Sequence, residues 1–423
     1  MRAKADKHVA VIGAGIIGAC TALELQKRNY RVSLIEPATP GGTQAASYGN
    51  GAMLSTASTI PMSVPGLWKK VPSYLLDQDG PLVVRWRHLP HMAGWMIRFL
   101  LAGCTTRRME RISNLNAGLM RGGPERHQAL AEEAGVPELI ARDGIIYAWK
   151  SRKDFQAEAS YWALRASQGL EWEELEGKAL RDAEPDLSPD YQFAVLVRSG
   201  GVCHDPGAYV RALTDLAVRR GADLVRARAC GLTIRGGVVQ GVTFADREAL
   251  ACDEVVISAG IHSRSLAAAA GDKVPLMAER GYHIELDESV VGPRRPLMPM
   301  DGKMANTMVR RGLRAAGQVE LCRHDAPPNW RRVDILRRHL QRTFPALNPD
   351  QAGRFWFGCR PSLPDCLPVI SASAASKGVY YAFGHGHIGL STGPSTASIL
   401  ADLMTSPTGR DDASPFSVTR FTG

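Results

Sequence analysis

The sequence predicts an α/β fold, in which a discontinuous Rossmann-type nucleotide-binding domain is interleaved with an α+β domain built on a mainly antiparallel sheet. Three observations predict it. Apolar runs at 8–12 and 31–35 flank a glycine turn and a helix-like stretch, which makes a βαβ unit of about thirty residues. Further buried strands are expected far along the chain, at 254–258 and 378–382. The stretch 281–320 alternates apolar and polar residues between turn glycines, which favours an antiparallel sheet.

The order of these elements sets the expected domain boundaries. The nucleotide-binding domain is expected at 1–57, 190–275 and 353–423, and the second domain at 58–189 and 276–352. The segment 41–66 is rich in Gly, Ser, Thr, Ala and Pro, which predicts a long functional loop. A strand at 223–226 and a hairpin turning at Gly236 and Gly237 lead back to the first sheet. Helical composition predicts the remaining helices, at 85–134, 154–168, 209–220, 330–344 and 394–404.

Composition narrows the class of protein. The 423 residues are 45% hydrophobic and 22% charged, typical of a globular chain of two or three domains. The net charge of +9 is spread over arginine pairs without a nucleic-acid-binding signature, so no nucleic-acid partner is expected. Solvated faces explain the charge, and peripheral contact with an anionic membrane is the alternative.

The ends and the apolar stretches of the chain bear on its location. Residues 1–7 are polar, and the apolar stretch 89–103 is short and interrupted by charge, so neither a secretion signal nor a spanning helix is predicted. We therefore expect a cytoplasmic protein, with peripheral contact at the inner face of the cell membrane as a further option. The eight cysteines form no CxxC and are expected to be free thiols. No cluster has metal-ligand spacing, so no metal is expected.

The glycine turn after the first strand indicates a dinucleotide. Gly13 permits a tight turn, Gly15 lets the backbone approach a diphosphate, and Gly18 allows close packing of helix and strand. The helix that follows offers its N–H groups and the positive end of its dipole. Glu36, just after the second strand, is placed to accept hydrogen bonds from ribose hydroxyls and disfavours a 2′-phosphate.

NAD and FAD share this fingerprint, and the rest of the chain favours FAD. Ala259 and Gly260 follow a strand more than two hundred residues later, and a third glycine-rich element spans 384–390. Three distant segments that converge on one long cofactor fit FAD better than NAD. The residues expected to bind it are Gly13, Ala14, Gly15, Ile16, Ile17, Gly18, Glu36, Ser47, Asn50, Gly51, Val225, Ala259, Gly260, Gly384, Gly386, His387, Gly389 and Leu390.

These residues carry a resemblance over nearly the whole chain. The chain resembles the FAD-dependent amino-acid oxidoreductases of the D-amino-acid oxidase and glycine oxidase superfamily, and its pattern is most similar to the bacterial D-amino-acid dehydrogenase branch. The order of the matching stretches is more specific than any one of them. They lie at 9–18, 45–51, 61–66, 281–284, 313–320, 360–365 and 384–386. Gly49 before Asn50 and the pair Tyr282–His283 depart from the branch's usual pattern.

The resemblance implies that Arg360 binds the substrate carboxylate, and a guanidinium fork suits that role. One of Tyr282 and His283 is expected to close the site. Only one can face the cavity, because neighbouring residues of a strand point to opposite faces, and sheet packing is the alternative for each. A helix from Pro394 is expected to point its positive end at the flavin and stabilise its reduced form.

The implied reaction is oxidative deamination of a D-amino acid. Hydride passes from the α-carbon to flavin N5, and the imino acid is hydrolysed to a keto acid and ammonia, with a quinone or carrier protein as electron acceptor. A dehydrogenase or oxidase for hydroxyproline, proline, glycine or sarcosine is the alternative on the same fold. A non-catalytic FAD-binding subunit is the alternative from another class.

Overall fold

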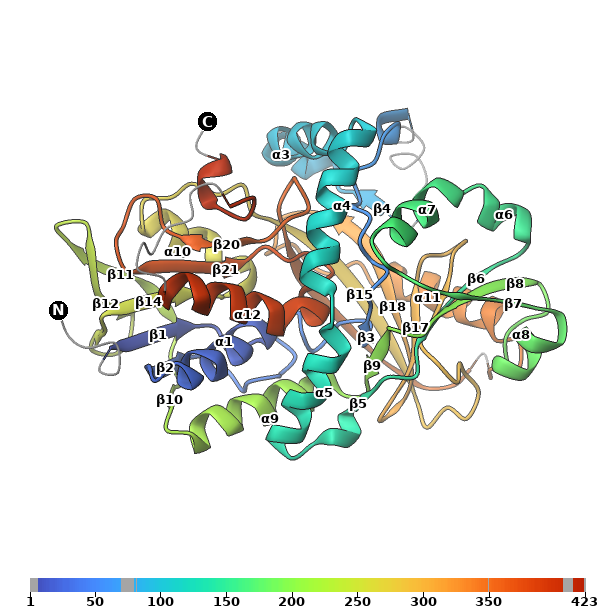
Figure 1. The fold of residues 1–423 in the computed structure, drawn as a ribbon, viewed down its shortest axis with the longest axis horizontal. Coiled ribbons are helices and arrows are strands. Elements are labelled where there is room, and N and C mark those ends of the chain that lie inside the picture. Colours follow the sequence, from blue (N-terminus) through green and yellow to red (C-terminus); the bar gives the residue numbers. More distant parts are fainter. Residues whose placement is uncertain (1–6, 70–79, 81, 349, 406–413, 422–423) are drawn as a thin grey trace.

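The first sheet joins strands from the beginning, middle and end of the chain. The computed structural model describes residues 7–69, 80, 82–348, 350–405 and 414–421 (Figure 1); most of the polar start, residues 1–6, lies outside them. Five strands are parallel and β20 is antiparallel to β21. In sheet order they are β10 (Asp223–Val225), β2 (Arg31–Ile35), β1 (His8–Ile12), β14 (Glu254–Ile257), β21 (Val379–Phe383) and β20 (Val369–Ala372). The predicted α/β class is confirmed.

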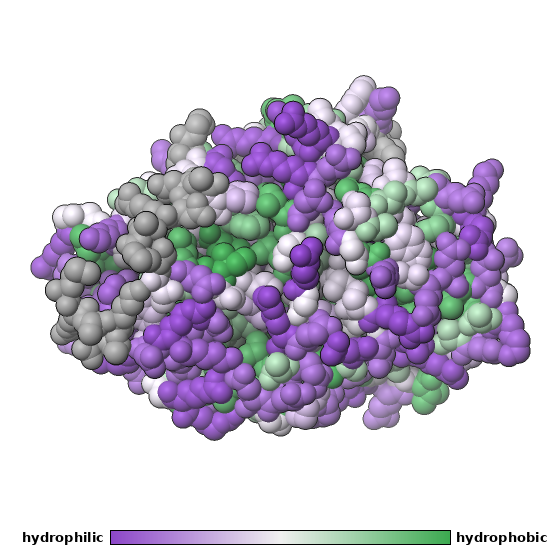
Figure 2. Space-filling model, in the orientation of Figure 1, coloured by the Kyte–Doolittle hydropathy of each residue, from purple (hydrophilic) through white to green (hydrophobic). Residues whose placement is uncertain are grey.

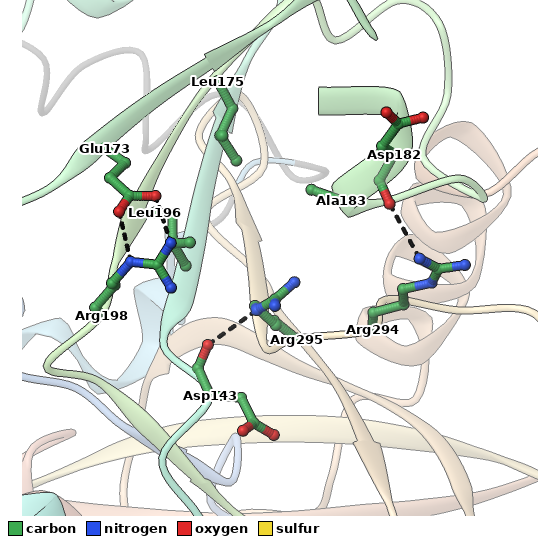
Figure 3. Close-up of a pocket in the computed structure, with 9 residues that line it drawn as sticks. All are labelled: Asp143, Glu173, Leu175, Asp182, Ala183, Leu196, Arg198, Arg294 and Arg295. Atoms are coloured by element: carbon green, nitrogen blue, oxygen red, sulfur yellow. Dashed lines mark hydrogen bonds and ion pairs between the residues drawn. The ribbon is translucent and has the colours of Figure 1, made fainter. Parts of the chain in front are cut away.

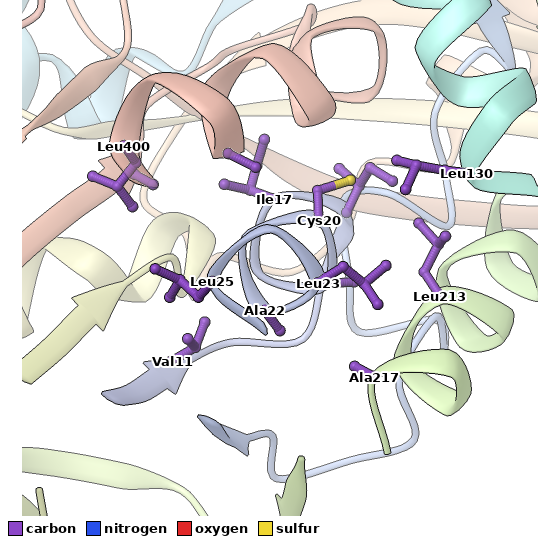
Figure 4. Close-up of a cluster of buried hydrophobic side chains, with 14 of the residues drawn as sticks. Val11, Ile17, Cys20, Ala22, Leu23, Leu25, Leu130, Leu213, Ala217 and Leu400 are labelled. Atoms are coloured by element: carbon purple, nitrogen blue, oxygen red, sulfur yellow. The ribbon is translucent and has the colours of Figure 1, made fainter. Parts of the chain in front are cut away.

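Helices from three regions pack on one face of this sheet. Helix α1 (Ile16–Lys27) lies between α9 (Pro206–Arg219) and α12 (Gly389–Thr405), and α5 (Gly123–Ala134) joins them. Figure 4 shows Leu23 of α1 facing Leu213 of α9, with Leu400 of α12 on the other side of the helix. Residues of α1 are buried nearly all round, so the helix is fixed by packing rather than by an amphipathic stripe.

The opposite face is covered by a small sheet and a short helix. Strands β11 (Ala229–Arg235), β12 (Val238–Phe244) and β13 (Leu250–Ala251) form the sheet, which includes the predicted hairpin. The 3-10 turn η4 (Gly260–His262) and helix α10 (Ser263–Ala269) follow β14, and a 3-10 turn, η5 (Val418–Phe421), packs there near the end of the chain.

A nine-stranded, mainly antiparallel sheet forms the second half of the molecule. Its central strands carry helix α11 (Arg331–Thr343) on one face. The expected boundaries assign β8 and β19 to the nucleotide-binding segments, whereas both pair here, because each finds its hydrogen-bonding partner in this sheet. In sheet order the strands are β19 (Gly353–Ser362), β15 (Met277–Asp287), β18 (Gly312–Leu321), β17 (Ala305–Val309), β16 (Leu297–Pro299), β6 (Ile145–Trp149), β8 (Phe193–Val197) and β7 (Glu173–Glu176), and β4 (Leu82–Val84) pairs with β18.

The remaining elements surround these two sheets. A three-stranded sheet of β3 (Met53–Leu54), β9 (Gly201–Cys203) and β5 (Ile140–Ala141) lies between them (Figure 1). Figure 2 shows a mostly hydrophilic face on which hydrophobic residues gather in separate patches. The other helices are η2 (Trp86–His88), α3 (Leu89–Ala102), α4 (Thr106–Met120), η3 (Pro137–Leu139), α6 (Arg152–Gln156), α7 (Ala159–Ser167) and α8 (Gly177–Ala183).

Three predicted helices differ from the structure. The stretch expected to be helical at 85–134 is divided into η2, α3, α4 and α5. The helix expected at 154–168 is two helices, α6 and α7. The last helix begins at Gly389 instead of Pro394, and Pro394 lies inside it. Proline cannot donate to the carbonyl four residues before it, and His127 Nε2 lies 2.7 Å from that carbonyl, Leu390 O. This contact satisfies the carbonyl and lets the helix start one turn earlier. No helix in the described part of the chain is both long and apolar enough to cross a bilayer.

Candidate active site

The glycine turn after β1 has the geometry of a dinucleotide-binding loop. Gly13 has φ +99°, and a Cβ there would lie 2.7 Å from Ser258 O. A Cβ on Gly18 would lie 1.8 Å from Gly13 O, so only glycine lets α1 approach the strand. Gly15 has open space, with only Ser47 Oγ at 3.5 Å from such a Cβ. The turn is thus closed toward the protein and open on the side where a diphosphate would approach.

The start of α1 is prepared for an anion. Gly15 provides no side-chain cap, and the first turn contains no acidic residue. The N–H of Ile16 donates to Ser47 Oγ (3.1 Å), which brings the 41–51 loop over the helix end. The N–H groups of the first turn and the dipole therefore face the loop without a competing carboxylate.

Glu36 is held beside this turn. Its buried carboxylate accepts a hydrogen bond from Ala14 N–H (Oε2, 3.0 Å), and its own N–H donates to Val225 O (3.0 Å) on β10. Val225 thus positions Glu36 through its backbone. The arrangement fits the ribose of an adenosine group at the ends of β2 and β10.

The other two predicted cofactor segments reach the same sheet edge. β1, β14 and β21 are adjacent and parallel, so the loops after them emerge together. Ser258 Oγ donates to Ile12 O (3.0 Å), which joins the loop of Ala259 and Gly260 to the glycine turn. The segment 384–388 follows β21, and Gly389 and Leu390 open α12.

A buried arginine shapes the loop that contains Asn50 and Gly51. Arg314 Nη1 donates to Asn50 O (2.7 Å) and Tyr48 O (3.1 Å), and its guanidinium pairs with the buried Glu285. Thr307 Oγ1 donates to Gly51 O (2.9 Å). The second sheet therefore fixes this loop through its carbonyls, while the N–H groups of Tyr48 and Asn50 donate within the loop, to Ala45 O (3.1 Å) and Ser47 O (3.4 Å). The amide of Asn50 is partly used, because its Oδ1 accepts from Ala52 N–H (2.9 Å).

Arg360 reaches from β19 across β15 to β18 on one face of the nine-stranded sheet. Its guanidinium lies over Gly281, where a Cβ would be 2.5 Å from Cζ, and Nη1 donates to Gln318 O (3.0 Å). Burial lowers the pKa of Arg360, with Glu279 opposing the shift, and guanidinium remains charged at neutral pH. One carbonyl cannot satisfy a five-donor fork, so Arg360 retains donors for an anion.

A cavity lies at the end of β21, and Glu279, the register partner of Arg360, forms part of its wall. His387 exposes its ring to this cavity, yet burial, aided by the charge of Arg360, lowers its pKa to about 4. The cavity is lined by Pro61, Met62, Asn116, Glu279, Ser362, Leu363, Cys366, Gly384, His385, Gly386, His387 and Ile388.

Tyr282 and His283 lie on opposite faces of β15. Tyr282 packs in the core under α11, and its hydroxyl donates to the buried Glu320 (2.5 Å). It therefore does not share the face of Arg360, and the expectation that it could close the site is corrected. His283 shares that face but is 2% exposed, stacks on Trp356 (5.1 Å between centroids) and lies 3.3 Å from Gly49 O. Burial lowers its pKa to about 3, so it is a neutral packing group.

Sequence reasoning missed the cavity wall outside the glycine loops. Glu279 and Ser362 come from neighbouring strands, and Asn116 comes from α4. The available signal was the alternation of Glu279, Gly281, His283 and Glu285, which places a carboxylate on the same face as the glycine under Arg360. The buried His385 instead holds the loop to α12, with Nε2 2.9 Å from Thr396 Oγ1.

A second hollow lies at the far edge of the nine-stranded sheet (Figure 3). Its three arginines are engaged by neighbours: Arg198 pairs with Glu173, Arg295 Nε donates to Asp143 O (2.9 Å), and Arg294 Nη1 donates to Asp182 O (3.0 Å). β7 and β8 are remote from β19 in the sheet order, so this hollow is separate from the cavity beside Arg360. The described residues contain no group of three or more His, Cys, Asp or Glu side chains that could hold a metal.

Comparison with known proteins agrees with this geometry. Residues 8–403 match the family described as FAD dependent oxidoreductase (DAO). A D-amino-acid oxidase of Bradyrhizobium diazoefficiens is 47% identical over 98% of this chain and 99% of the relative, and a D-amino acid dehydrogenase of Rhizobium rhizogenes is 26% identical over the same shares. The crystal structure of glycine oxidase from Geobacillus kaustophilus superposes with a TM-score of 0.74 at 21% identity, over 99% of this chain and 100% of that one. The predicted resemblance and the prediction of FAD are confirmed. The chain belongs to the DAO family of FAD-dependent oxidoreductases.

Proposed function

We propose that this protein oxidatively deaminates D-amino acids, and that the glycine turn, Glu36 and the segment 384–390 hold FAD across the edge of the first sheet. Arg360 is the observation that carries the proposal: its register partner Glu279 lines the cavity, and its charge acts on His387 in the cavity wall. A half-buried guanidinium that has donors beyond the one used by Gln318 O suits a small carboxylate. The names of the relatives, D-amino-acid oxidase and D-amino acid dehydrogenase, support the substrate class.

Each part of the chain has a distinct task in this proposal. The start of α1 binds the diphosphate, and Glu36 accepts hydrogen bonds from the ribose. The start of α12 directs its N–H groups and dipole toward the flavin, where they favour negative charge. Bound FAD supplies a two-electron acceptor. Arg360 fixes the substrate carboxylate and so orients the α-carbon hydrogen.

The proposal is tested by anaerobic flavin reduction. A D-amino acid substrate should bleach the flavin absorbance near about 450 nm, whereas a structural FAD-binding subunit would show no bleaching. Arg360→Lys keeps the charge but loses the fork, so KM should rise about tenfold or more while flavin content stays unchanged. Arg360→Ala should raise KM further, because it loses the charge as well as the fork. Unchanged KM and turnover in Arg360→Ala would exclude Arg360 as the carboxylate-binding residue.

We propose a quinone or carrier protein as the electron acceptor, with oxygen as the second candidate. The dehydrogenase relatives support the first and the 47% identical oxidase supports the second. Peroxide production in air, measured with and without an artificial acceptor, separates the two. Stoichiometric peroxide at full turnover would exclude the carrier-dependent reaction.

A peripheral membrane contact is proposed at α3. Ile97 and Leu101 of this helix are 59% and 53% exposed, and the exposed Arg98 lies between them in the sequence. Apolar side chains beside an arginine suit the headgroup region of an anionic bilayer. Cosedimentation with anionic vesicles tests the contact. The wild type should sediment with the vesicles, and the double variant Ile97→Ser, Leu101→Ser should not. Equal sedimentation of the wild type and the double variant would reject the contact.

A further inference from the structure

Glu279 is a buried carboxylate in the cavity for which the proposed reaction so far has no role. Its side chain is 4% exposed and lies at the cavity wall with Ser362. On β15 it is in direct register with Arg360 on β19, so the two side chains share one face of the sheet. A glutamate in such a place carries a large desolvation cost unless a partner offsets it.

The two opposite charges do not pair directly. Among the described residues, no nitrogen of Arg360 lies within 4.0 Å of a Glu279 oxygen, although each shifts the pKa of the other. The guanidinium instead reaches across Gly281 to Gln318 O. The two charged groups are therefore held apart on one face of the sheet, and a small molecule with adjacent positive and negative groups can bridge them.

We propose that Glu279 binds the α-ammonium group of the substrate and accepts one of its protons, while Arg360 binds the carboxylate. This rests on the proposed function and adds to it the recognition of a zwitterion. In the proton transfer, one N–H bond of the ammonium breaks, an O–H bond forms on Glu279, and the nitrogen regains its lone pair. The nitrogen lone pair can then form the C=N bond of the iminium product as the α-hydrogen leaves with the electrons of its C–H bond as hydride, which FAD, as the two-electron acceptor, would take up when bound.

The surroundings favour Glu279 over His387 as the proton acceptor. Burial raises the pKa of Glu279 from its ordinary value, whereas burial and Arg360 lower the pKa of His387 to about 4. Protonation removes the desolvation cost of the buried Glu279 carboxylate. Protonation of the His387 imidazole would instead place a second positive charge near Arg360. Arg360 is the charged group that faces Glu279; the other titratable groups around the cavity are His385, His387 and Cys366, all with pKa shifts that keep them neutral.

The test compares two probes that differ only in the amine. 2-Aminoisobutyrate has no α-hydrogen and cannot be oxidised, and isobutyrate lacks the nitrogen. Binding to the oxidised holoenzyme is followed by the change in flavin absorbance. The wild type should prefer 2-aminoisobutyrate, and Glu279→Gln should weaken its binding about 10- to 100-fold, because a hydrogen bond to a charged group is lost. Isobutyrate binding should be unchanged or tighter in this variant.

Two further variants complete the binding test. Glu279→Asp keeps the charge and should retain part of the preference for the amine. Glu320→Gln removes a buried carboxylate from the opposite face of the same sheet and should leave the preference intact. A wild type without preference, or a Glu279→Gln variant that affects both probes equally or neither, would overturn the role of Glu279.

A pH profile tests the proton transfer. In the wild type, kcat/KM for a D-amino acid should stay level down to the pH at which Glu279 is protonated. In Glu279→Gln it should rise about tenfold per pH unit, since only the neutral amine in solution then reacts. The same dependence of kcat/KM on pH in the wild type and in Glu279→Gln would overturn the proton transfer to Glu279. If no D-amino acid reduces the wild-type flavin, the proposed function fails, whereas a reducible flavin with no probe preference leaves that function standing and rejects Glu279 alone.

Discussion

Gly281→Ala should damage substrate binding without damaging the fold. A Cβ at this position would lie 2.5 Å from Arg360 Cζ and from Nη2, and 2.7 Å from Nη1. Ordinary carbon contacts are about 3.5 Å, so the guanidinium must move by about 1 Å. The backbone of Gly281 is an ordinary strand conformation in register with Gly358, so alanine adds no backbone strain.

The displaced group is the end of a flexible side chain, which makes the move inexpensive for stability. We expect the free energy of unfolding to change by less than about 1 kcal/mol, below the 1–3 kcal/mol typical of overpacking in a rigid core. A misplacement of about 1 Å at a positioning group costs about 100-fold in rate. The expected loss in kcat/KM is therefore about 100-fold, close to 2.7 kcal/mol at about 1.36 kcal/mol per decade.

Steady-state kinetics with a D-amino acid, flavin content and thermal unfolding measure the three quantities. Gly118→Ala is the matched control, because Gly118 is exposed on α4 with no atom within 4 Å of its Cβ position. The control should keep full activity. A Gly281→Ala enzyme with kcat/KM within about threefold of the wild type would refute the placement of Arg360 as the substrate-binding group.

Three further outcomes follow from the contacts. Tyr282→Phe leaves Glu320 and the N–H of Asn329 without their hydroxyl partner, so the free energy of unfolding should fall by about 1–3 kcal/mol. The KM for the substrate should stay unchanged. A raised KM would show that Tyr282 belongs to the substrate site. Arg314→Met leaves Glu285 charged and buried, so the free energy of unfolding should fall by about 3–5 kcal/mol. The same substitution releases the loop at Asn50, so FAD should dissociate more readily, which flavin release on dilution measures. Equal retention of FAD in the variant and the wild type would contradict the role of this loop. Burial lowers the pKa of His127 from 6.5 to about 4, so the unfolded chain binds more protons between these values. The contribution of His127 to stability should therefore be complete above pH 6.5 and decline by about 3 kcal/mol toward pH 4. Denaturant unfolding across this range should show the decline in the wild type and a flatter profile in His127→Gln.

The cofactor half of the site could be predicted because it depends on short-range pattern. The turn of Gly13, Gly15 and Gly18 needs only the strand before it and the helix after it, and Glu36 follows one strand later. The first residue of α12 could not be predicted, since Pro394 suggests a helix start and only the contact between His127 and Leu390 O, from distant segments, permits an earlier one. The assignment of β8 and β19 likewise depended on which sheet supplied their hydrogen-bonding partners.

The sequence by itself determined the family, the cofactor and the class of fold, because a βαβ unit with a glycine turn is a local structure whose residues are adjacent in the chain. Only the tertiary structure decided what surrounds the substrate. The register of β15 with β19 turned Glu279 and His283 toward the face of Arg360 and Tyr282 toward the core. A shift of one residue would exchange these faces, and that register is set by partners far along the chain, so no local pattern contains it.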